Sequence, residues 1–217
     1  MRRKARPGGG RQIETTIAGL GGRGDGLAAF QGRPVFAAYA LPGERVRLKV
    51  TGERAGGFKA EVLEILEQSP ARVEPPCPHF GPCGGCALQH LEESAYRTWK
   101  AALIAEALAR AGVAAGALRP PISIPPGRRR RADFAALKRG KRMELGFHAR
   151  ESHEIVDLET CLLLTPGLLA LIEPLRALFF ELLVDGEAAE AIFNDCDNGL
   201  DLLLASARPL DLAARQQ

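Results

Sequence analysis

Three cysteines stand close together in a short segment that is rich in glycine and proline. Cys77, Cys83 and Cys86 follow the pattern C-x5-C-G-G-C within residues 75–90. Glycine and proline favour turns over a helix or a strand, and backbone N–H groups in turns point inward at sulfur ligands. Three thiolates leave a tetrahedral or cubane site one ligand short. We expect Cys161, far downstream, to supply the fourth.

The division of these ligands into three and one favours a 4Fe–4S cluster over zinc. Zinc sites usually pair two short spacings such as C-x2-C or H-x3-H, whereas each iron of a cube takes one thiolate. The ferredoxin spacing C-x2-C-x2-C-x3-C-P is not present, so an electron-carrier fold is not indicated. Zinc stays open as an alternative. A disulfide fits poorly, because no signal peptide is evident and the composition is typical of a cytoplasmic protein.

The chain resembles the RNA uracil-C5 methyltransferases that carry an N-terminal TRAM domain and an iron–sulfur cluster, such as the 23S ribosomal RNA (uracil-5-)-methyltransferases. The matching pieces are the cysteine pattern with the Gln-His pair after it, residues 145–148 (LGFH), residues 152–157 (SHEIVD) and Cys161. The resemblance implies that Cys77, Cys83, Cys86 and Cys161 bind a 4Fe–4S cluster. It also implies an RNA substrate, ribosomal or transfer.

The predicted fold class is α+β, in three parts. Residues 1–11 form a flexible basic arm, residues 12–69 an OB-like, TRAM-like β-barrel of five strands, and residues 70–217 an incomplete iron–sulfur cluster domain of mixed α/β structure. The strands are expected near residues 13–17, 26–30, 34–39, 45–50 and 58–66. Glycines at residues 19–26 look like a dinucleotide fingerprint, but no helix follows them, so we reject that interpretation.

Beyond the cysteines, the pattern predicts a helix at residues 92–111 that ends at Gly112. Its apolar stripe is expected to pack onto the cysteine loop and consists of Tyr96, Trp99, Leu103, Ala107 and Ala111. Residues 132–148 are expected to form a β-hairpin that turns at Gly140.

A second helix is predicted from Thr165, with Pro166 at its first position and a kink or break at Pro174. Residues 189–204 are expected to form a closing hairpin with Asp-Asn-Gly in its turn. Cys196 beside that turn is expected to be a structural or incidental thiol. His148 and His153 are expected to serve packing or a turn rather than a metal.

The charge of the chain is lopsided. Residues 1–150 hold 26 Lys and Arg against 13 acids, and residues 151–217 hold 3 against 13. A basic first part indicates a surface for a polyanion, although any one cation equally suits a solvated face. The candidate RNA contacts are Arg45, Arg47, Lys49, Arg128, Arg129, Arg130, Arg131, Lys138, Arg139, Lys141 and Arg142. No apolar run is long enough to cross a membrane, and no obligate protein partner is evident.

The sequence contains no candidate for the catalytic step of such a methyltransferase. Uracil C5 becomes nucleophilic only after a thiolate adds at C6, and a base then removes the C5 proton. We find no cysteine in that context and no glycine-rich loop for S-adenosylmethionine. We therefore expect the RNA-binding and 4Fe–4S part of an S-adenosylmethionine-dependent RNA uracil-C5 methyltransferase, without its Rossmann-like catalytic domain. The alternatives are a stand-alone RNA-binding module with a structural metal, and an iron–sulfur redox protein.

Overall fold

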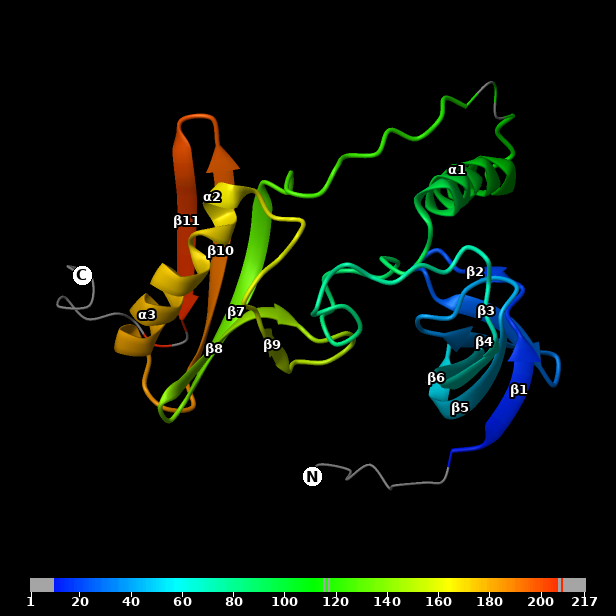
Figure 1. The fold of residues 1–217 in the computed structure, drawn as a ribbon, viewed down its shortest axis with the longest axis horizontal. Coiled ribbons are helices and arrows are strands. Elements are labelled where there is room, and N and C mark those ends of the chain that lie inside the picture. Colours follow the sequence, from blue (N-terminus) through cyan, green and yellow to red (C-terminus); the bar gives the residue numbers. More distant parts are fainter. Residues whose placement is uncertain (1–9, 115, 117, 207, 209–217) are drawn as a thin grey trace. The chain divides into compact units, whose positions relative to one another are not determined.

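The computed structural model describes residues 10–114, 116, 118–206 and 208, so most of the predicted basic arm lies outside the described residues. Contacts divide the chain into two compact units, each of which is described by itself. The first unit comprises Met1–Pro75 and Ala87–Pro121, and the second comprises Pro76–Cys86 and Ile122–Gln217. Each unit is built on one sheet, with few helices (Figure 1). The predicted α+β class is confirmed, whereas the predicted domain boundaries stay a prediction.

The first unit contains a six-stranded sheet in the order β1-β5-β6-β4-β3-β2. All neighbours are antiparallel except β4 and β6, which pair in parallel. The five expected strands are present, and the two-residue strand β2 was not predicted. In chain order the strands are β1 (Gln12–Thr16), β2 (Gly19–Leu20), β3 (Gly26–Phe30), β4 (Arg33–Ala37), β5 (Arg45–Arg54) and β6 (Gly57–Glu67).

Two glycine positions shape this sheet. Gln31 and Gly32 both have positive φ, at 52° and 74°, and make the tight turn between β3 and β4; paired positive φ values match the right-handed twist of a hairpin. A Cβ at Gly57 would lie 2.2 Å from the carbonyl oxygen of Pro34. Only glycine therefore allows β6 to approach β4 this closely at its start.

The helix α1 (Glu93–Arg110) has the predicted ends. Glu92 accepts hydrogen bonds from the N–H groups of Ser94 and Ala95, and Gly112 with a φ of 68° closes the C-terminus. The N–H groups of Gly112 and Val113 reach back to the last free carbonyls, as a Schellman motif requires. The end signals in the sequence are confirmed.

The predicted apolar stripe of α1 is buried over less of its length than expected. Tyr96 and Trp99 near its start pack against a small cluster of Leu41, Leu88 and Leu91 in the first unit, and no residue of α1 is buried. The stripe beyond Trp99 is mostly alanine, which offers little area to bury. The predicted packing of the helix onto the cysteine loop stays a prediction.

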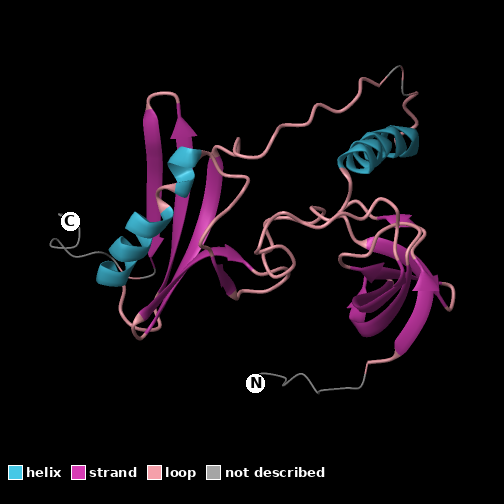
Figure 2. Cartoon of the chain, in the orientation of Figure 1, coloured by secondary structure: helices cyan, strands magenta, loops and turns pink. Residues whose placement is uncertain are grey.

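The second unit contains a five-stranded antiparallel sheet in the order β11-β10-β7-β8-β9. Two helices cover one face of it (Figure 2), and both predicted hairpins are confirmed. The elements are β7 (Arg131–Arg139), β8 (Arg142–His148), β9 (Ile155–Asp157), α2 (Pro166–Leu169), α3 (Ile172–Leu182), β10 (Ala188–Cys196) and β11 (Gly199–Ser206).

The core of the second unit lies between this sheet and the helices. Phe134 of β7 packs edge-to-face against Phe147 and Phe193, each with its ring centroid at 5.0 Å, and Phe179 of α3 is buried in the same cluster. Such aromatic pairs stabilise beyond the area that they bury. The opposite face of the sheet carries no helix from the described residues.

The predicted break in the second helix is confirmed. The helix divides into α2 and α3 at Ala170 and Leu171, and Pro174 falls in the first turn of α3, where its missing N–H removes no helical hydrogen bond. Lys138 donates from Nζ to the carbonyl oxygens of Phe180 and Leu183 at the end of α3. Among the described helices, none has the length and apolar character that crossing a bilayer requires.

A buried ion pair organises the first unit next to its smaller core. Glu44 is completely buried and accepts hydrogen bonds from the Leu41 N–H at 2.8 Å and from Arg72 Nε at 2.6 Å. Burial acts to raise the pKa of Glu44, but the hydrogen bonds and charge of Arg72 outweigh it and the pKa is lowered. His90 is 1% exposed nearby. The pKa of His90 is lowered to about 4, mainly by burial and secondly by the positive charge of Arg72.

The first unit should lose stability as the pH falls from about 6.5 to 4. The folded state keeps His90 neutral down to a pKa of about 4, against an ordinary value of 6.5, so between these values the unfolded chain binds the extra proton. The loss should reach about 3 kcal/mol at pH 4. Urea unfolding followed by the fluorescence of Trp99 measures it. His90→Gln should remove this part of the pH dependence; an unchanged pH profile in that variant would contradict the assignment.

Candidate metal centre

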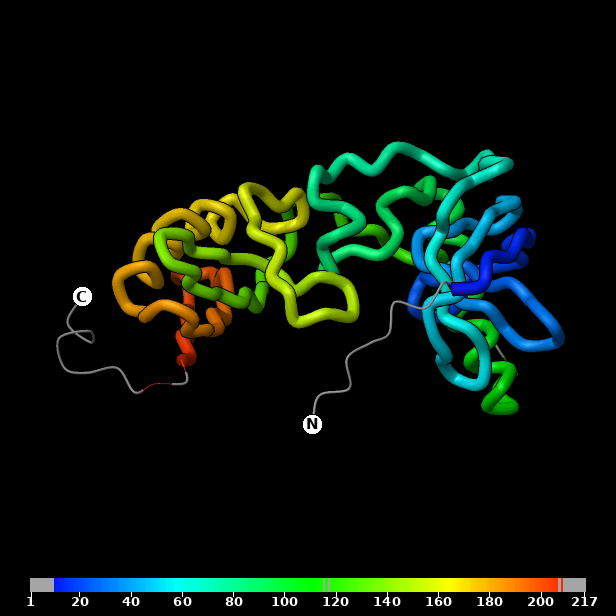
Figure 3. The backbone as a smooth tube through the Cα atoms, turned by 90° about the horizontal axis from the view of Figure 1, so that it is seen from below, coloured from blue at the N-terminus to red at the C-terminus, as the bar shows by residue number. Residues whose placement is uncertain are grey.

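The segment Pro76–Cys86 is held in the second unit by backbone contacts to the end of β8. Within the segment, the N–H of Cys83 donates to the carbonyl oxygen of His79 at 3.0 Å. Cys83 also makes an isolated bridge to Ala149, and the N–H of Gly84 donates to the carbonyl oxygen of His148 at 3.0 Å. Figures 1 and 3 show the blue-green segment beside the loop that follows β8.

Gly84, the first of the two glycines between Cys83 and Cys86, has a steric reason. A Cβ at Gly84 would lie 2.6 Å from the carbonyl oxygen of His148, so glycine lets the backbone approach the strand there. A Cβ at Gly85 would lie 3.4 Å from Cys83 Sγ and from the ring of Phe147, which is an ordinary contact distance. The N–H of Gly85 points at Cys83 Sγ, at 3.4 Å.

Cys161 reaches the second unit through the short strand β9. After Asp157 the N–H of Leu158 donates to the carbonyl oxygen of Leu145, and the Leu158 side chain is buried. Beyond Cys161, Leu163 accepts a hydrogen bond from the N–H of Arg129 at 2.8 Å. The chain on both sides of Cys161 is thus fixed to neighbouring strands. β9 (Ile155–Asp157) covers the last three residues of the 152–157 run and leads toward Cys161.

The cysteines of this unit interact but are not closed into a metal site. All five described cysteines are free thiols. Burial raises the pKa of Cys83; the Gly85 N–H opposes this, and the neighbouring thiols of Cys161 and Cys77 add to the increase. The sulfurs of Cys161 and Cys77 therefore lie within electrostatic range of Cys83. Within the described part of the chain, no group of three or more His, Cys, Asp or Glu side chains has metal-binding geometry.

The residues nevertheless fit a thiolate-bound centre in three respects. Cys77, Cys83, Cys86 and Cys161 belong to one compact unit, although the first three are separated from the rest of it by a stretch of the first unit. Cys83 is buried, whereas Cys77, Cys86 and Cys161 are half-buried and accessible to a metal. The amide of Gly85 already points at a sulfur, as in iron–sulfur loops.

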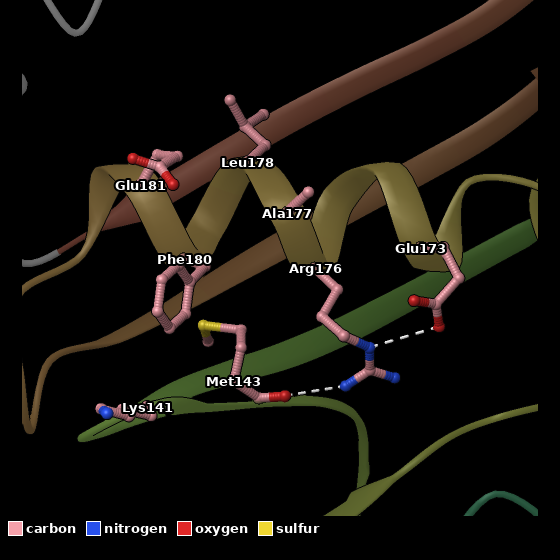
Figure 4. Close-up of a pocket in the computed structure, with 8 residues that line it drawn as sticks. All are labelled: Lys141, Met143, Glu173, Arg176, Ala177, Leu178, Phe180 and Glu181. Carbon is pink, nitrogen blue, oxygen red and sulfur yellow. Dashed lines mark hydrogen bonds and ion pairs between the residues drawn. The ribbon is translucent and has the colours of Figure 1, made fainter.

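An arginine anchors the segment that precedes Cys161. Arg176 of α3 pairs with Asp157 and donates to the carbonyl oxygens of Met143 at 2.7 Å and Leu158 at 2.8 Å. Figure 4 shows the guanidinium between Met143 and Glu173. Burial acts to raise the pKa of Asp157, but the hydrogen bond from Arg176 leads the opposing effects and the pKa is lowered.

Two cavities of the second unit lie away from the sulfurs. One of about 520 Å³ lies between β8 and α3, and its charged lining residues are Lys141, Glu173, Arg176 and Glu181 (Figure 4). The other, of about 420 Å³, lies on the uncovered face of the sheet beside His148 and His153. The two imidazole rings pack edge-to-face with centroids 6.2 Å apart, in keeping with the packing role predicted for them.

Most of the cations predicted to contact RNA are paired within the protein. The ion pairs of these residues are Arg45 with Glu14 and Glu67, Arg47 with Glu14 and Glu64, Arg130 with Asp197, Arg131 with Asp133, Arg139 with Glu144, and Arg142 with Asp157. Lys138 is turned inward to the end of α3. Among the described residues, Lys49, Arg128, Arg129 and Lys141 are the predicted contacts without a carboxylate partner. The sequence did not reveal this pairing, because most of the partners lie far away along the chain.

Known proteins similar to this chain are RNA methyltransferases. The chain is 39% identical over 195 residues to an uncharacterised RNA methyltransferase of Rhizobium meliloti, covering 86% of this chain and 45% of that protein. It is 35% identical over 217 residues to the 23S rRNA (uracil(1939)-C(5))-methyltransferase RlmD of Pectobacterium atrosepticum, covering 99% of this chain and 48% of that protein. The chain is homologous to RNA methyltransferases. It spans about half the length of the curated relatives that it matches.

A solved structure has a similar fold. It is the crystal structure of Pyrococcus abyssi tRNA (uracil-54, C5)-methyltransferase in complex with S-adenosyl-L-homocysteine. The TM-score is 0.63 at 19% sequence identity, and the match covers 94% of this chain and 48% of that one. At this identity the similarity shows a shared fold and nothing more. No family model matches the chain.

Replacing Arg176 by methionine should destabilise the second unit by about 2–4 kcal/mol, because the half-buried Asp157 would lose its half-buried partner and keep only the exposed Arg142. Urea unfolding followed by circular dichroism measures the loss. Hydrogen exchange should also quicken at the amides of β9. Arg131→Met is the matched control: it removes a charge from an exposed pair of the same unit and should change the stability by less than about 1 kcal/mol. Equal effects of the two substitutions would contradict the anchoring role.

Proposed function

We propose that this chain is the N-terminal, RNA-binding and cluster-binding part of an S-adenosylmethionine-dependent RNA uracil-C5 methyltransferase. The observation that carries the proposal is the 35% identity over 217 residues to a 23S rRNA uracil-C5 methyltransferase. The fold shared with a tRNA uracil-C5 methyltransferase is compatible with the same architecture. The RNA would be ribosomal or transfer RNA, and the cell compartment the cytoplasm.

The first unit is proposed to be a TRAM-like RNA-binding barrel. Its support is the mixed sheet of short strands that spans residues 12–67 and pairs β4 with β6 in parallel. The N–H of Ala18 also donates to the carbonyl oxygen of Leu27, so the chain after β1 bends back toward β3. Such curvature suits the small barrels that bind oligonucleotides.

In the second unit we propose that Cys77, Cys83, Cys86 and Cys161 hold a 4Fe–4S cluster. Their support is the joining of Pro76–Cys86 to the residues around Cys161 in one unit, together with the amide directed at Cys83 Sγ. When bound, the cluster would supply four iron–thiolate bonds. The protein's part is to turn amides toward the sulfurs and to keep both segments on the sheet.

Because most of the arginines are paired, we propose that RNA first contacts the cations that have no described carboxylate partner. Lys49 lies on β5, Arg128 lies before β7, and Lys141 lies in the turn between β7 and β8; none of these three has a described carboxylate partner. A phosphate meets them without first displacing a carboxylate. The six paired arginines add to the general positive potential of residues 1–150.

The proposed 4Fe–4S site is tested by iron analysis of anaerobically purified protein. The wild-type chain should contain about four irons and absorb broadly near 400 nm. Cys83→Ser and Cys161→Ser should each lose most of this iron. Cys196→Ser is the matched control, since Cys196 is an exposed thiol on β10, and it should retain the full amount. A wild-type chain that binds zinc but no iron would overturn the cluster assignment.

The proposed division of labour is tested on an undermodified ribosomal RNA fragment. This chain alone should bind the RNA with an affinity that falls steeply with salt, because binding releases counterions from phosphates. It should transfer no methyl group from labelled S-adenosylmethionine, because its sequence contains no nucleophilic cysteine beside a cofactor loop. Methylation of the fragment by the chain alone would contradict the proposal, as would the absence of RNA binding at low salt.

A further inference from the structure

Arg129 is fixed in the backbone next to the segment that follows Cys161. Its N–H donates to the carbonyl oxygen of Leu163 at 2.8 Å, and its carbonyl oxygen accepts from the N–H of Thr165 at 3.1 Å. These bonds form an isolated bridge between Arg129 and Leu164. The position of the residue is therefore set by the loop that carries Cys161.

The side chain of Arg129 lies over an aromatic ring of the same unit. Its guanidinium carbon is 5.5 Å from the centroid of Phe147, and its Nε donates to the carbonyl oxygen of Arg131 at 3.2 Å. The neighbouring Arg130 and Arg131 are paired with Asp197 and Asp133. In contrast, no described carboxylate neutralises Arg129. Its positive charge is thus available to another anion.

The ring under Arg129 lies against the cysteine turn. The space where Gly85 lacks a side chain is bounded on one side by Phe147 and on the other by Cys83 Sγ, each 3.4 Å from the position of a Cβ. Arg129 therefore lies over the ring that faces the turn of Cys83 and Gly85.

We propose that Arg129 is a positioning residue of the cysteine site, whose positive charge offsets the negative charge of the four thiolates and their cluster. The inference depends on the proposed 4Fe–4S site. Four thiolates around a cluster core of two positive charges leave a net charge of about −2, which is costly to hold on a partly buried loop. Arg129, placed among the candidate RNA contacts by sequence alone, is thereby assigned to the metal site.

The experiment compares the rate at which an iron chelator bleaches the absorbance near 400 nm in four proteins. These are the wild-type chain, Arg129→Gln, Arg129→Lys and Arg128→Gln. Loss of the charge in Arg129→Gln should quicken bleaching by about tenfold, the size expected of one charge acting at short range in a medium of intermediate dielectric constant. Arg129→Lys keeps the charge and should stay within about threefold of the wild type. Arg128→Gln removes an adjacent charge and should bleach at the wild-type rate.

Urea unfolding of the iron-free proteins separates charge from folding. Arg129→Gln and Arg128→Gln should unfold at the same urea concentration, so that the faster bleaching is not a loss of fold. Equal bleaching rates in Arg129→Gln and the wild type would overturn the inference, as would an Arg129→Lys variant that bleaches as fast as Arg129→Gln. A wild-type chain without iron would instead overturn the proposed cluster, so the two failures are distinguishable.

Discussion

The ion pair between Arg176 and Asp157 is the interaction on which the second unit depends most. β9 has only three residues and pairs with β8 alone, so its ladder is too short to hold the following loop by itself. Arg176 reaches from α3 to Asp157 and to the carbonyl oxygens of Met143 and Leu158, which joins helix, β8 and β9 at one point. A half-buried guanidinium with several acceptors is costly to remove because each acceptor then loses its donor. Cys161 lies four residues beyond Asp157, so its position depends on these contacts of Arg176.

The cysteine segment is held in a different way, by backbone and not by side chains. Cys83 and Gly84 contact Ala149 and His148 through main-chain atoms, and the segment contributes almost no apolar side chain to the core of the second unit. A segment with so little buried area has little reason to stay in place. Bonds from its sulfurs to a shared metal centre would close a loop of more than seventy residues between Cys86 and Cys161, the situation in which a cross-link restricts the unfolded chain strongly. A weakly packed segment that carries three thiols is thus suited to being held in place by a shared metal centre.

Local signals in the sequence were sufficient for much of this fold. Gly112 ends α1, Pro174 in the first turn of α3 follows the break after α2, and Gly140 turns the hairpin of β7 and β8, each for a reason that lies within a few residues. The failures are all tertiary. The packing of α1 stops at Trp99, the last residue of the helix that packs against the cluster of Leu41, Leu88 and Leu91. The strand β2 is too short for any periodicity to reveal. The cysteine spacing predicts a four-cysteine site, and that assignment stays a prediction. The position of Arg129 depends on a bridge to Leu164 that no spacing shows.

Tertiary contacts also explain why a count of charged residues predicts the sign of the surface charge but not which cations are free to bind an anion. Residues 1–150 are strongly basic whether or not their arginines are paired, and at distances beyond a few ångströms an approaching polyanion responds to that sum. At contact distance, the ion pairs of the arginines determine how easily a phosphate can bind them. An exposed pair such as Arg130 with Asp197 is weak because solvent screens it, so a phosphate that binds the guanidinium bidentately can replace the carboxylate. Arg47 is held by Glu14 and Glu64 together, and a phosphate would have to displace both. The cations of the first part of the chain therefore differ in how readily a phosphate could bind them, in an order set by their carboxylate neighbours and not by their place in the sequence.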